Sequence, residues 1–125
     1  FYGVRSGLVL GRDYSLVMDI GGGSVEFIIG NDTEIVWKQS FEIGAQRLLE
    51  MFHRTDPIEE SEIDELNQYF SRQLPPLIEA LHQWLPNTLI GSSGTFDTLS
   101  DIYCIKHGIY KKEESIETPL TIEGF

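Results

Sequence analysis

The residues of this chain that could do chemistry gather in one glycine-rich stretch. Two carboxylates, Asp19 and Glu26, and the hydroxyl of Ser24 bracket three consecutive glycines at 21–23. A tight hairpin needs one or two glycines for positive φ angles, and a third adds a further cost in chain entropy. The pattern therefore favours a loop whose backbone N–H groups approach a phosphate oxygen closely.

The polar residues around these glycines could each add a function. Asp19, at the end of a strand, could hold a hydrated Mg²⁺ ion or orient water, and Ser24 could donate a hydroxyl hydrogen bond. Glu26 alternates with Val25 and Phe27, so it is expected to point to the same face as Ser24. A glycine-rich hairpin with solvated acids stays open as the alternative for this stretch alone.

A second stretch of small residues, 91–95, follows a short strand and enters a helix. Helix N-termini attract anions through their free N–H groups and the helix dipole. Taken alone, the stretch is better explained by ordinary helix capping through Ser93 or Thr95. Two such loops after two strands of one short chain favour the two sides of a single oligoanion site.

The surrounding pattern predicts the elements that must position these loops. Strand-like runs at 16–18, 25–29 and 34–41 indicate a three-stranded antiparallel meander, and 88–90 is a short buried strand. Helices are predicted at 45–54 and 95–107, the second ending at Gly108. The order is β-β-β-α-α-β-α, an α/β arrangement, and the tail at 111–125 suggests the start of another element.

The longest predicted helix lies between these elements. Asp56 as the cap, Pro57 at the first helical position and Glu59 three residues after the cap predict its start. The acidic run at 59–62 is expected to cap the start of this helix and to be solvated, because negative charge is favourable there. The apolar face is expected to carry Ile63, Leu66, Phe70 and Leu74. Pro75-Pro76 should kink or split the helix.

Composition narrows the class of protein. The 125 residues carry a net charge of −11, which argues against binding nucleic acid or anionic membranes. No apolar run reaches the roughly 18–20 residues that cross a bilayer. The single cysteine, Cys104, fits a reducing cytoplasm. Because the chain starts at Phe1 without a signal peptide, it is expected to be an excised domain.

At this point the motifs resemble a known family. Segment 16–26 resembles the glycine-rich phosphate loop of the exopolyphosphatase / guanosine pentaphosphate phosphohydrolase (Ppx/GppA) family. Segment 41–48 is similar to the family's strand that ends at Gly and precedes an Arg on the next helix, and 91–95 is similar to its later loop. The resemblance implies a ribonuclease H-like domain of the actin, Hsp70 and sugar kinase type, with helices packed on a mixed sheet.

The resemblance also implies roles for individual residues. Asp19 and Glu26 are the catalytic and metal-binding candidates, organising Mg²⁺ and water. The implied phosphate-binding residues are Gly21, Gly22, Gly23, Ser24, Arg47, Gly91, Ser92, Ser93, Gly94 and Thr95. For Arg47 a surface ion pair is an equal alternative, and Arg5 and Arg12 are further cations that could serve the phosphates. The chain departs from the family at Val25, where Thr is usual, and at Ser92, where Ala or Thr is common.

The implied function is that of a larger enzyme. Residues 1–125 would be one phosphate-loop domain of a protein with two or more domains, and the family's catalytic Glu would precede Phe1, so the isolated chain is expected to be inactive. The parent would release terminal phosphate from inorganic polyphosphate or guanosine pentaphosphate with Mg²⁺. Expected partners are that substrate, the parent's N-terminal domain and, as often in the family, a second copy.

Two other classes of function stay open. One is a noncatalytic sensor that binds guanosine tetra- or pentaphosphate, or polyphosphate, and signals through a partner. The other is an ATP-dependent kinase or chaperone-like member of the same superfamily. The negative charge of the chain counts against a polyanionic substrate, unless backbone N–H groups and a divalent cation hold the phosphates.

Overall fold

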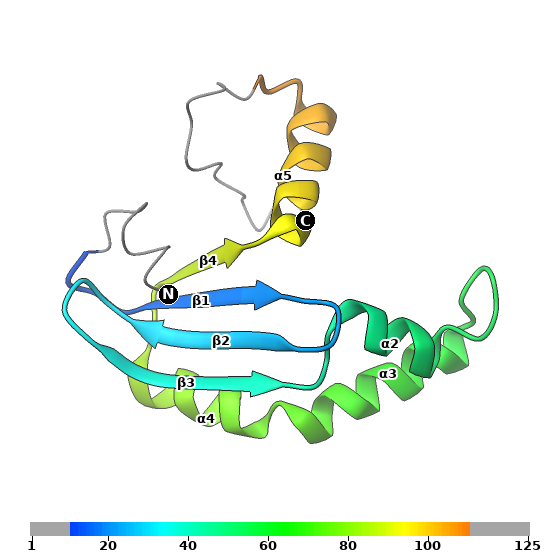
Figure 1. Cartoon of the computed structure of the whole chain (residues 1–125), viewed down its shortest axis with the longest axis horizontal. Helices are drawn as coiled ribbons and strands as arrows, with labels where there is room; N and C mark the ends of the chain where they lie inside the picture. The colour runs from blue at the N-terminus through cyan, green and yellow to red at the C-terminus, as the bar shows by residue number, and fades with distance from the viewer. Residues whose placement is uncertain (1–10, 111–125) are drawn as a thin grey trace.

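A computed structural model describes residues 11–110, which form a mixed four-stranded sheet with helices packed against it (Figure 1). The strands are β1 (Ser15–Ile20), β2 (Val25–Gly30), β3 (Ile35–Phe41) and β4 (Thr88–Ser92). The helices are α2 (Ala45–Phe52), α3 (Glu60–Gln73), α4 (Pro75–Trp84) and α5 (Gly94–His107). Arg5 and the element expected at 111–125 lie outside the described residues. No helix of residues 11–110 is long and apolar enough to cross a bilayer.

The sheet has the strand order β3-β2-β1-β4. β1, β2 and β3 pair antiparallel, which confirms the predicted meander, and β4 adds to it parallel to β1. Because parallel strands end at the same edge of a sheet, the loops that follow β1 and β4 lie at one edge. These are the two loops that the sequence singled out.

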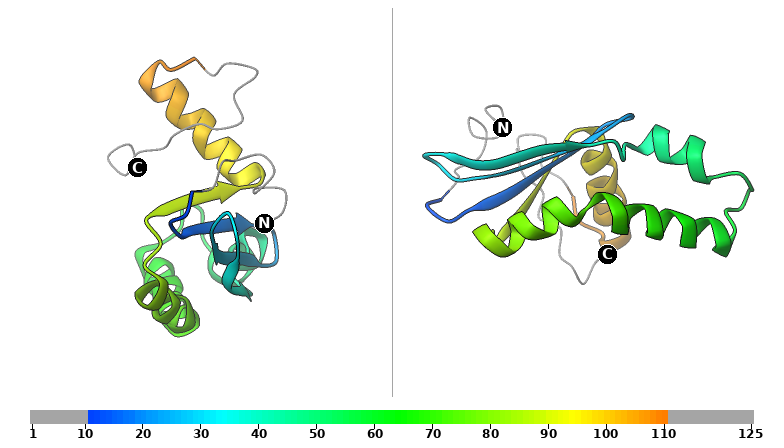
Figure 2. Two further views of the ribbon diagram at one scale, coloured as in Figure 1. Left: turned by 90° about the vertical axis from the view of Figure 1, so that its left-hand side faces the viewer. Right: turned by 90° about the horizontal axis from the view of Figure 1, so that it is seen from below.

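One face of the sheet carries the core. Val25, Phe27 and Ile29 alternate along β2, are buried, and pack in one cluster with Leu77 and Ala80 of α4. Figure 2 shows α3 and α4 running beneath the strands as a layer on this side. Burial of each large apolar side chain contributes about 1.5–3 kcal/mol, so this face fixes the orientation of the whole sheet. Residues between the core positions must then face the opposite side.

The long helix splits at the prolines, as predicted, but begins later than predicted. α3 ends at Gln73, and α4 starts at Pro75 with Pro in its first turn. At the other end, α3 starts at Glu60, and Asp56 is not its cap. Asp56 and Pro57 belong to the connection from α2, where their peptide bond is cis. Glu59 takes the cap position, and its N–H donates to the carboxylate of Glu62 at 2.9 Å.

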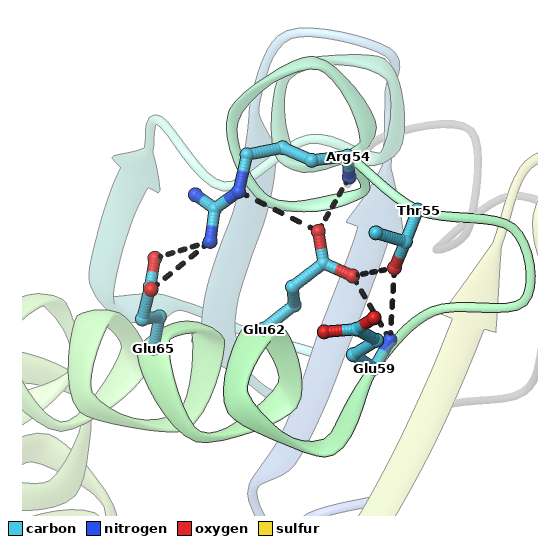
Figure 3. Close-up of polar contacts among 5 residues, drawn as sticks. All are labelled: Arg54, Thr55, Glu59, Glu62 and Glu65. Atoms are coloured by element: carbon cyan, nitrogen blue, oxygen red, sulfur yellow. Dashed lines mark hydrogen bonds and ion pairs between the residues drawn. The ribbon is translucent and has the colours of Figure 1, made fainter.

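Glu62 is also the buried residue of the first turn, with 2% of its surface exposed, whereas Ile63 is 42% exposed. Both expectations for this turn, a solvated Glu62 and an inward Ile63, are wrong. The carboxylate of Glu62 accepts hydrogen bonds from the Arg54 N–H at 2.7 Å, the Glu59 N–H and the Thr55 hydroxyl (Figure 3). A buried carboxylate needs such donors, and they lie on the segment that leaves α2. Glu62 therefore joins the end of α2 to the start of α3.

Candidate functional site

The glycine loop between β1 and β2 is docked on the first turn of α2 (Figure 1). The loop is closed by the N–H of Gly21, which donates to the carbonyl of Ser24 at 2.9 Å. The N–H groups of Ala45, Arg47 and Gly44 donate to the carbonyl oxygens of Gly21, Gly22 and Gly23, at 3.0, 3.1 and 3.3 Å respectively. The start of α2 therefore holds three consecutive carbonyl groups of the loop.

This docking determines where the loop N–H groups point. In a planar trans peptide the C=O and N–H bonds point in opposite directions, and these peptide bonds are trans. With the carbonyls of Gly21–Gly23 directed at α2, the N–H groups of Gly22, Gly23 and Ser24 point away from it. None of the three has a hydrogen-bond partner within residues 11–110. Three free N–H groups in succession on one side of a turn are donors that an anion could accept.

The backbone angles of the loop do not explain its glycines. Positive φ angles within residues 11–110 occur only at Leu85, Ser93 and Gly108, so no residue of the loop needs one. A Cβ on Gly23 would have nothing within 4 Å, and one on Gly22 would make an ordinary 3.7 Å contact with Gln46. The missing side chains therefore leave open space above the backbone. This fits the predicted close approach to a ligand better than a plain hairpin.

Gly44 is a site residue that the sequence interpretation did not include. A Cβ at this position would lie 2.4 Å from the carbonyl carbon of Gly23 and from the backbone nitrogen of Ser24. Only glycine lets α2 approach the loop so closely. The available signal was its position between a strand and a helix, but its partners lie some twenty residues earlier in the chain.

The two candidate carboxylates are direct neighbours in the sheet. Asp19 of β1 pairs with Glu26 of β2 on one side and with Ser92 of β4 on the other. Cross-strand partners share a face, with Cβ atoms of antiparallel neighbours about 4.5–5.5 Å apart. The alternation along β2 puts this row on the face opposite α4. Within residues 11–110 neither carboxylate forms an ion pair, and no three His, Cys, Asp or Glu side chains gather as a metal site.

The second loop is tied to the first. The hydroxyl groups of Ser93 and Thr95 both donate to the carbonyl oxygen of Ile20, each at 3.3 Å. Ser93 occupies the N-cap position of α5 but makes no side-chain capping bond, and its φ of 80° is unusual for a residue with a side chain. The N–H groups of Gly94 and Thr95 have no partner within residues 11–110. The structure thus brings the two predicted loops together.

Three of the residues that the sequence suggested for phosphate binding have other contacts or lie elsewhere. A Cβ on Gly91 would lie 2.0 Å from the Phe96 ring, so this glycine makes room for α5. Arg47 donates through Nε to the carbonyl of Gly23 at 2.9 Å, and its Nη2 lies 3.8 Å from Oε1 of Glu42, the ion pair that the sequence left open. Arg12 precedes β1 and so lies at the end of that strand away from the glycine loop.

Fold and loops together define a class: a ribonuclease H-like domain of the actin type, with two small-residue loops after neighbouring parallel strands. The family model described as the Ppx/GppA phosphatase family matches residues 1–117. The chain belongs to this family.

Individual relatives agree with that assignment. The chain is similar to exopolyphosphatase 2 of Mycobacterium tuberculosis, with 34% identity over 85 residues, which cover 68% of this chain and 26% of that protein. It is similar to the guanosine-5′-triphosphate,3′-diphosphate pyrophosphatase of Photobacterium profundum, with 32% identity, covering 74% of this chain and 18% of that protein.

Two solved structures resemble the domain. An exopolyphosphatase from Cytophaga hutchinsonii superposes with a TM-score of 0.79 and 50% identity, covering 90% of this chain and 35% of that one. The Ppx/GppA enzyme of Aquifex aeolicus superposes with a TM-score of 0.65 and 24% identity, covering 86% of this chain and 33% of that one. This likeness supports the fold alone. The predicted fold class and family are confirmed. The chain spans about a third or less of the length of these relatives.

Proposed function

We propose that this chain is the phosphate-loop domain of a phosphohydrolase that releases terminal phosphate from inorganic polyphosphate, guanosine pentaphosphate or both. Relatives named exopolyphosphatase and guanosine-5′-triphosphate,3′-diphosphate pyrophosphatase support this substrate class. The proposed phosphate-binding residues are those of the loops at 21–24 and 91–95. Asp19 and Glu26 are the proposed catalytic and metal-binding residues.

The observation that carries the proposal is the fixed orientation of the glycine loop. Three successive N–H groups, of Gly22, Gly23 and Ser24, are directed away from α2 by the hydrogen bonds that hold their peptide units. Further free N–H groups belong to the start of α5, whose Ser93 and Thr95 hydroxyls donate to Ile20, the residue before the glycine loop. Such donors bind phosphate oxygens without any basic side chain. This suits a chain with a net charge of −11.

The donor set also fits Mg²⁺. This ion prefers oxygen ligands, keeps several waters, and is usually held by one or two carboxylates together with substrate phosphates. Asp19 and Glu26 would provide the carboxylates, from neighbouring strands beside the loop. When bound, the ion would neutralise charge on the phosphate chain and polarise the reacting phosphoryl group. The loop N–H groups would orient the same phosphates.

Other parts of the activity are expected from the rest of the protein. We expect residues 1–125 to be one domain of a larger enzyme whose general base, a Glu, lies in the preceding segment. We also expect a cytoplasmic location, in line with the free, buried thiol of Cys104. A second copy of the protein is a further expected partner.

The proposal is tested on the complete protein that contains this chain. Mg²⁺-dependent phosphate release is measured with polyphosphate and with guanosine pentaphosphate, for the wild type and for Asp19→Asn. We expect the substitution to lower kcat/KM by about 100-fold or more, because a metal-linked carboxylate is lost. Asp64→Asn, which changes an exposed carboxylate on α3, is the matched control and should act like the wild type.

The outcomes separate the candidate functions. Release that collapses in Asp19→Asn but not in Asp64→Asn supports the phosphohydrolase and identifies its preferred substrate. No release from either substrate by the wild type, with both still bound, would sink the enzyme proposal in favour of a sensor. Hydrolysis or transfer that requires ATP would instead favour a kinase-like member of the superfamily.

A further inference from the structure

We propose that Arg47 is a positioning residue: it acts on phosphate through the glycine loop and does not contact phosphate itself. The inference rests on the proposed function of that loop and adds to it the side chain that sets the loop's geometry. Arg47 lies in the first turn of α2, and its Nε donates to the carbonyl oxygen of Gly23 at 2.9 Å.

The carbonyl of Gly23, unlike those of Gly21 and Gly22, accepts a hydrogen bond from a side chain, that of Arg47. The same carbonyl also accepts the N–H of Gly44, but at 3.3 Å, the longest of the three contacts between the loop and α2. The Arg47 contact is shorter and charge-assisted, so it is the stronger bond on this peptide unit. The N–H of Ser24 belongs to the same unit, and its direction follows from the carbonyl of Gly23.

The guanidinium lies on the carbonyl side of the loop, which does not suit a direct contact with phosphate. A phosphate bound to the N–H of Ser24 lies on the opposite side of the peptide from the carbonyl that Arg47 holds. A second guanidinium nitrogen, Nη2, lies 3.8 Å from Oε1 of Glu42. The geometry thus assigns Arg47 to the carbonyl side, together with the start of α2.

Two substitutions separate positioning from direct contact. In Arg47→Gln the side-chain amide nitrogen lies as many bonds from the backbone as Nε does, so it can donate to Gly23 without any charge. Arg47→Met has similar reach and no donor. Positioning requires the donor alone, whereas a direct phosphate contact requires the charge.

The complete protein is assayed for kcat and KM on polyphosphate with Mg²⁺. We expect Arg47→Met to lower kcat/KM about two- to tenfold, the usual range for one hydrogen bond. Arg47→Gln should restore most of that loss. Equal losses in both variants, with activity retained by Arg47→Lys, would overturn the inference and establish a direct contact of the charge with phosphate.

A second measurement does not depend on activity. Amide hydrogen exchange of a peptide that begins at least two residues before Gly21 and ends at Ser24 reports on the N–H of Gly21, which closes the loop by bonding to Ser24. Arg47→Met should speed this exchange about two- to tenfold in the ligand-free protein, and Arg47→Gln should not. Unchanged exchange in Arg47→Met overturns the inference. An inactive wild type would contradict the proposed function, but the exchange measurement would still test the role of Arg47.

Discussion

At the scale of single residues, the glycines of the site have different physical tasks. Gly44 and Gly91 make room for other parts of the chain, since a Cβ would meet the backbone of Gly23 in one case and the Phe96 ring in the other. A Cβ on Gly23, in contrast, would have no atom of residues 11–110 within 4 Å. The proposed function puts a ligand in this open space. Substitution by alanine can therefore separate folding from binding.

Gly23→Ala is expected to leave the fold intact and to impair the proposed activity. Its Cβ meets no atom within 4 Å, so the free energy of unfolding should stay the same or rise by up to about 1 kcal/mol. The methyl group would obstruct a phosphate at the loop N–H groups and lower kcat/KM about tenfold or more. Thermal unfolding and phosphate release on the complete protein measure the two effects.

Two further alanines serve as controls for that experiment. Gly11→Ala also meets nothing within 4 Å, but lies before β1 and should change neither property. Gly44→Ala places a methyl group 2.4 Å from backbone atoms and should destabilise the domain by about 3 kcal/mol. Unimpaired hydrolysis in Gly23→Ala would contradict a close approach of phosphate to the loop.

At the scale of elements, α2 joins the glycine loop to the rest of the helical layer. Its first turn holds the loop carbonyls, and the segment after its last turn donates to Glu62 at the start of α3. The hydrogen bond from the Thr55 hydroxyl, followed by those from the Glu59 and Arg54 N–H groups, lowers the pKa of Glu62 from 4.5 to about 2. The ionised carboxylate is therefore the form that the folded state favours.

Glu62→Gln should consequently destabilise the domain in a pH-dependent way. A carboxylate whose pKa is lower in the folded than in the unfolded state stabilises above its unfolded value, here near 4.5. That contribution is lost as the pH falls from 4.5 towards 2. The difference in free energy of unfolding between wild type and variant should be largest near neutral pH and should shrink across this window. Denaturant unfolding at a series of pH values measures it.

Glu65→Gln is the matched control. Glu65 also forms an ion pair with Arg54, whose Nη2 lies 3.0 Å from Oε2, but the side chain of Glu65 is exposed. Exposed ion pairs contribute little, so this variant should stay within about 0.5 kcal/mol of the wild type. A pH-independent loss in Glu62→Gln would mean that the side chain acts by packing and not by charge.

The sequence was a good guide to the elements and a poor guide to the contacts between them. Alternation along 25–29 and the glycine run before it were sufficient for the meander and the first loop, because both are local properties. The start of α3 was misplaced because Asp56-Pro57 has a locally better capping pattern than Glu59. The choice of Glu59 is coupled to the contacts of Glu62 with Arg54 and Thr55, and no local pattern encodes those.

The candidate site shows the same difference between local patterns and long-range contacts. Asp19, Ser24 and Glu26 became candidates through their spacing, and strand pairing makes Asp19 and Glu26 neighbours. The contacts of Gly44 and Arg47 with Gly23 join segments more than twenty residues apart, and only the folded chain brings them together. The family resemblance made Arg47 a candidate phosphate contact, with a surface ion pair as an equal alternative, but the sequence could not determine where its guanidinium lies.

At the scale of the whole molecule, the charge of the chain opposes its proposed substrate. Twenty Asp and Glu residues outnumber nine Lys and Arg residues, which gives the net charge of −11. Proteins that hold polyanions with basic side chains lose affinity steeply as salt rises, because bound counterions are released. Neutral backbone N–H groups displace few of the counterions that surround a polyanion, and added salt screens the repulsion between this chain and the polyanion.

The salt dependence of binding should therefore have the opposite sign from that of a basic groove. With saturating Mg²⁺, we expect the affinity of the 125-residue chain for tripolyphosphate to stay level or rise severalfold between about 20 and 200 mM KCl, as the Debye length falls from roughly 20 to 7 Å. Isothermal titration calorimetry measures this directly. A steep fall in affinity would contradict recognition by backbone donors and would indicate that Lys and Arg side chains bind the phosphates.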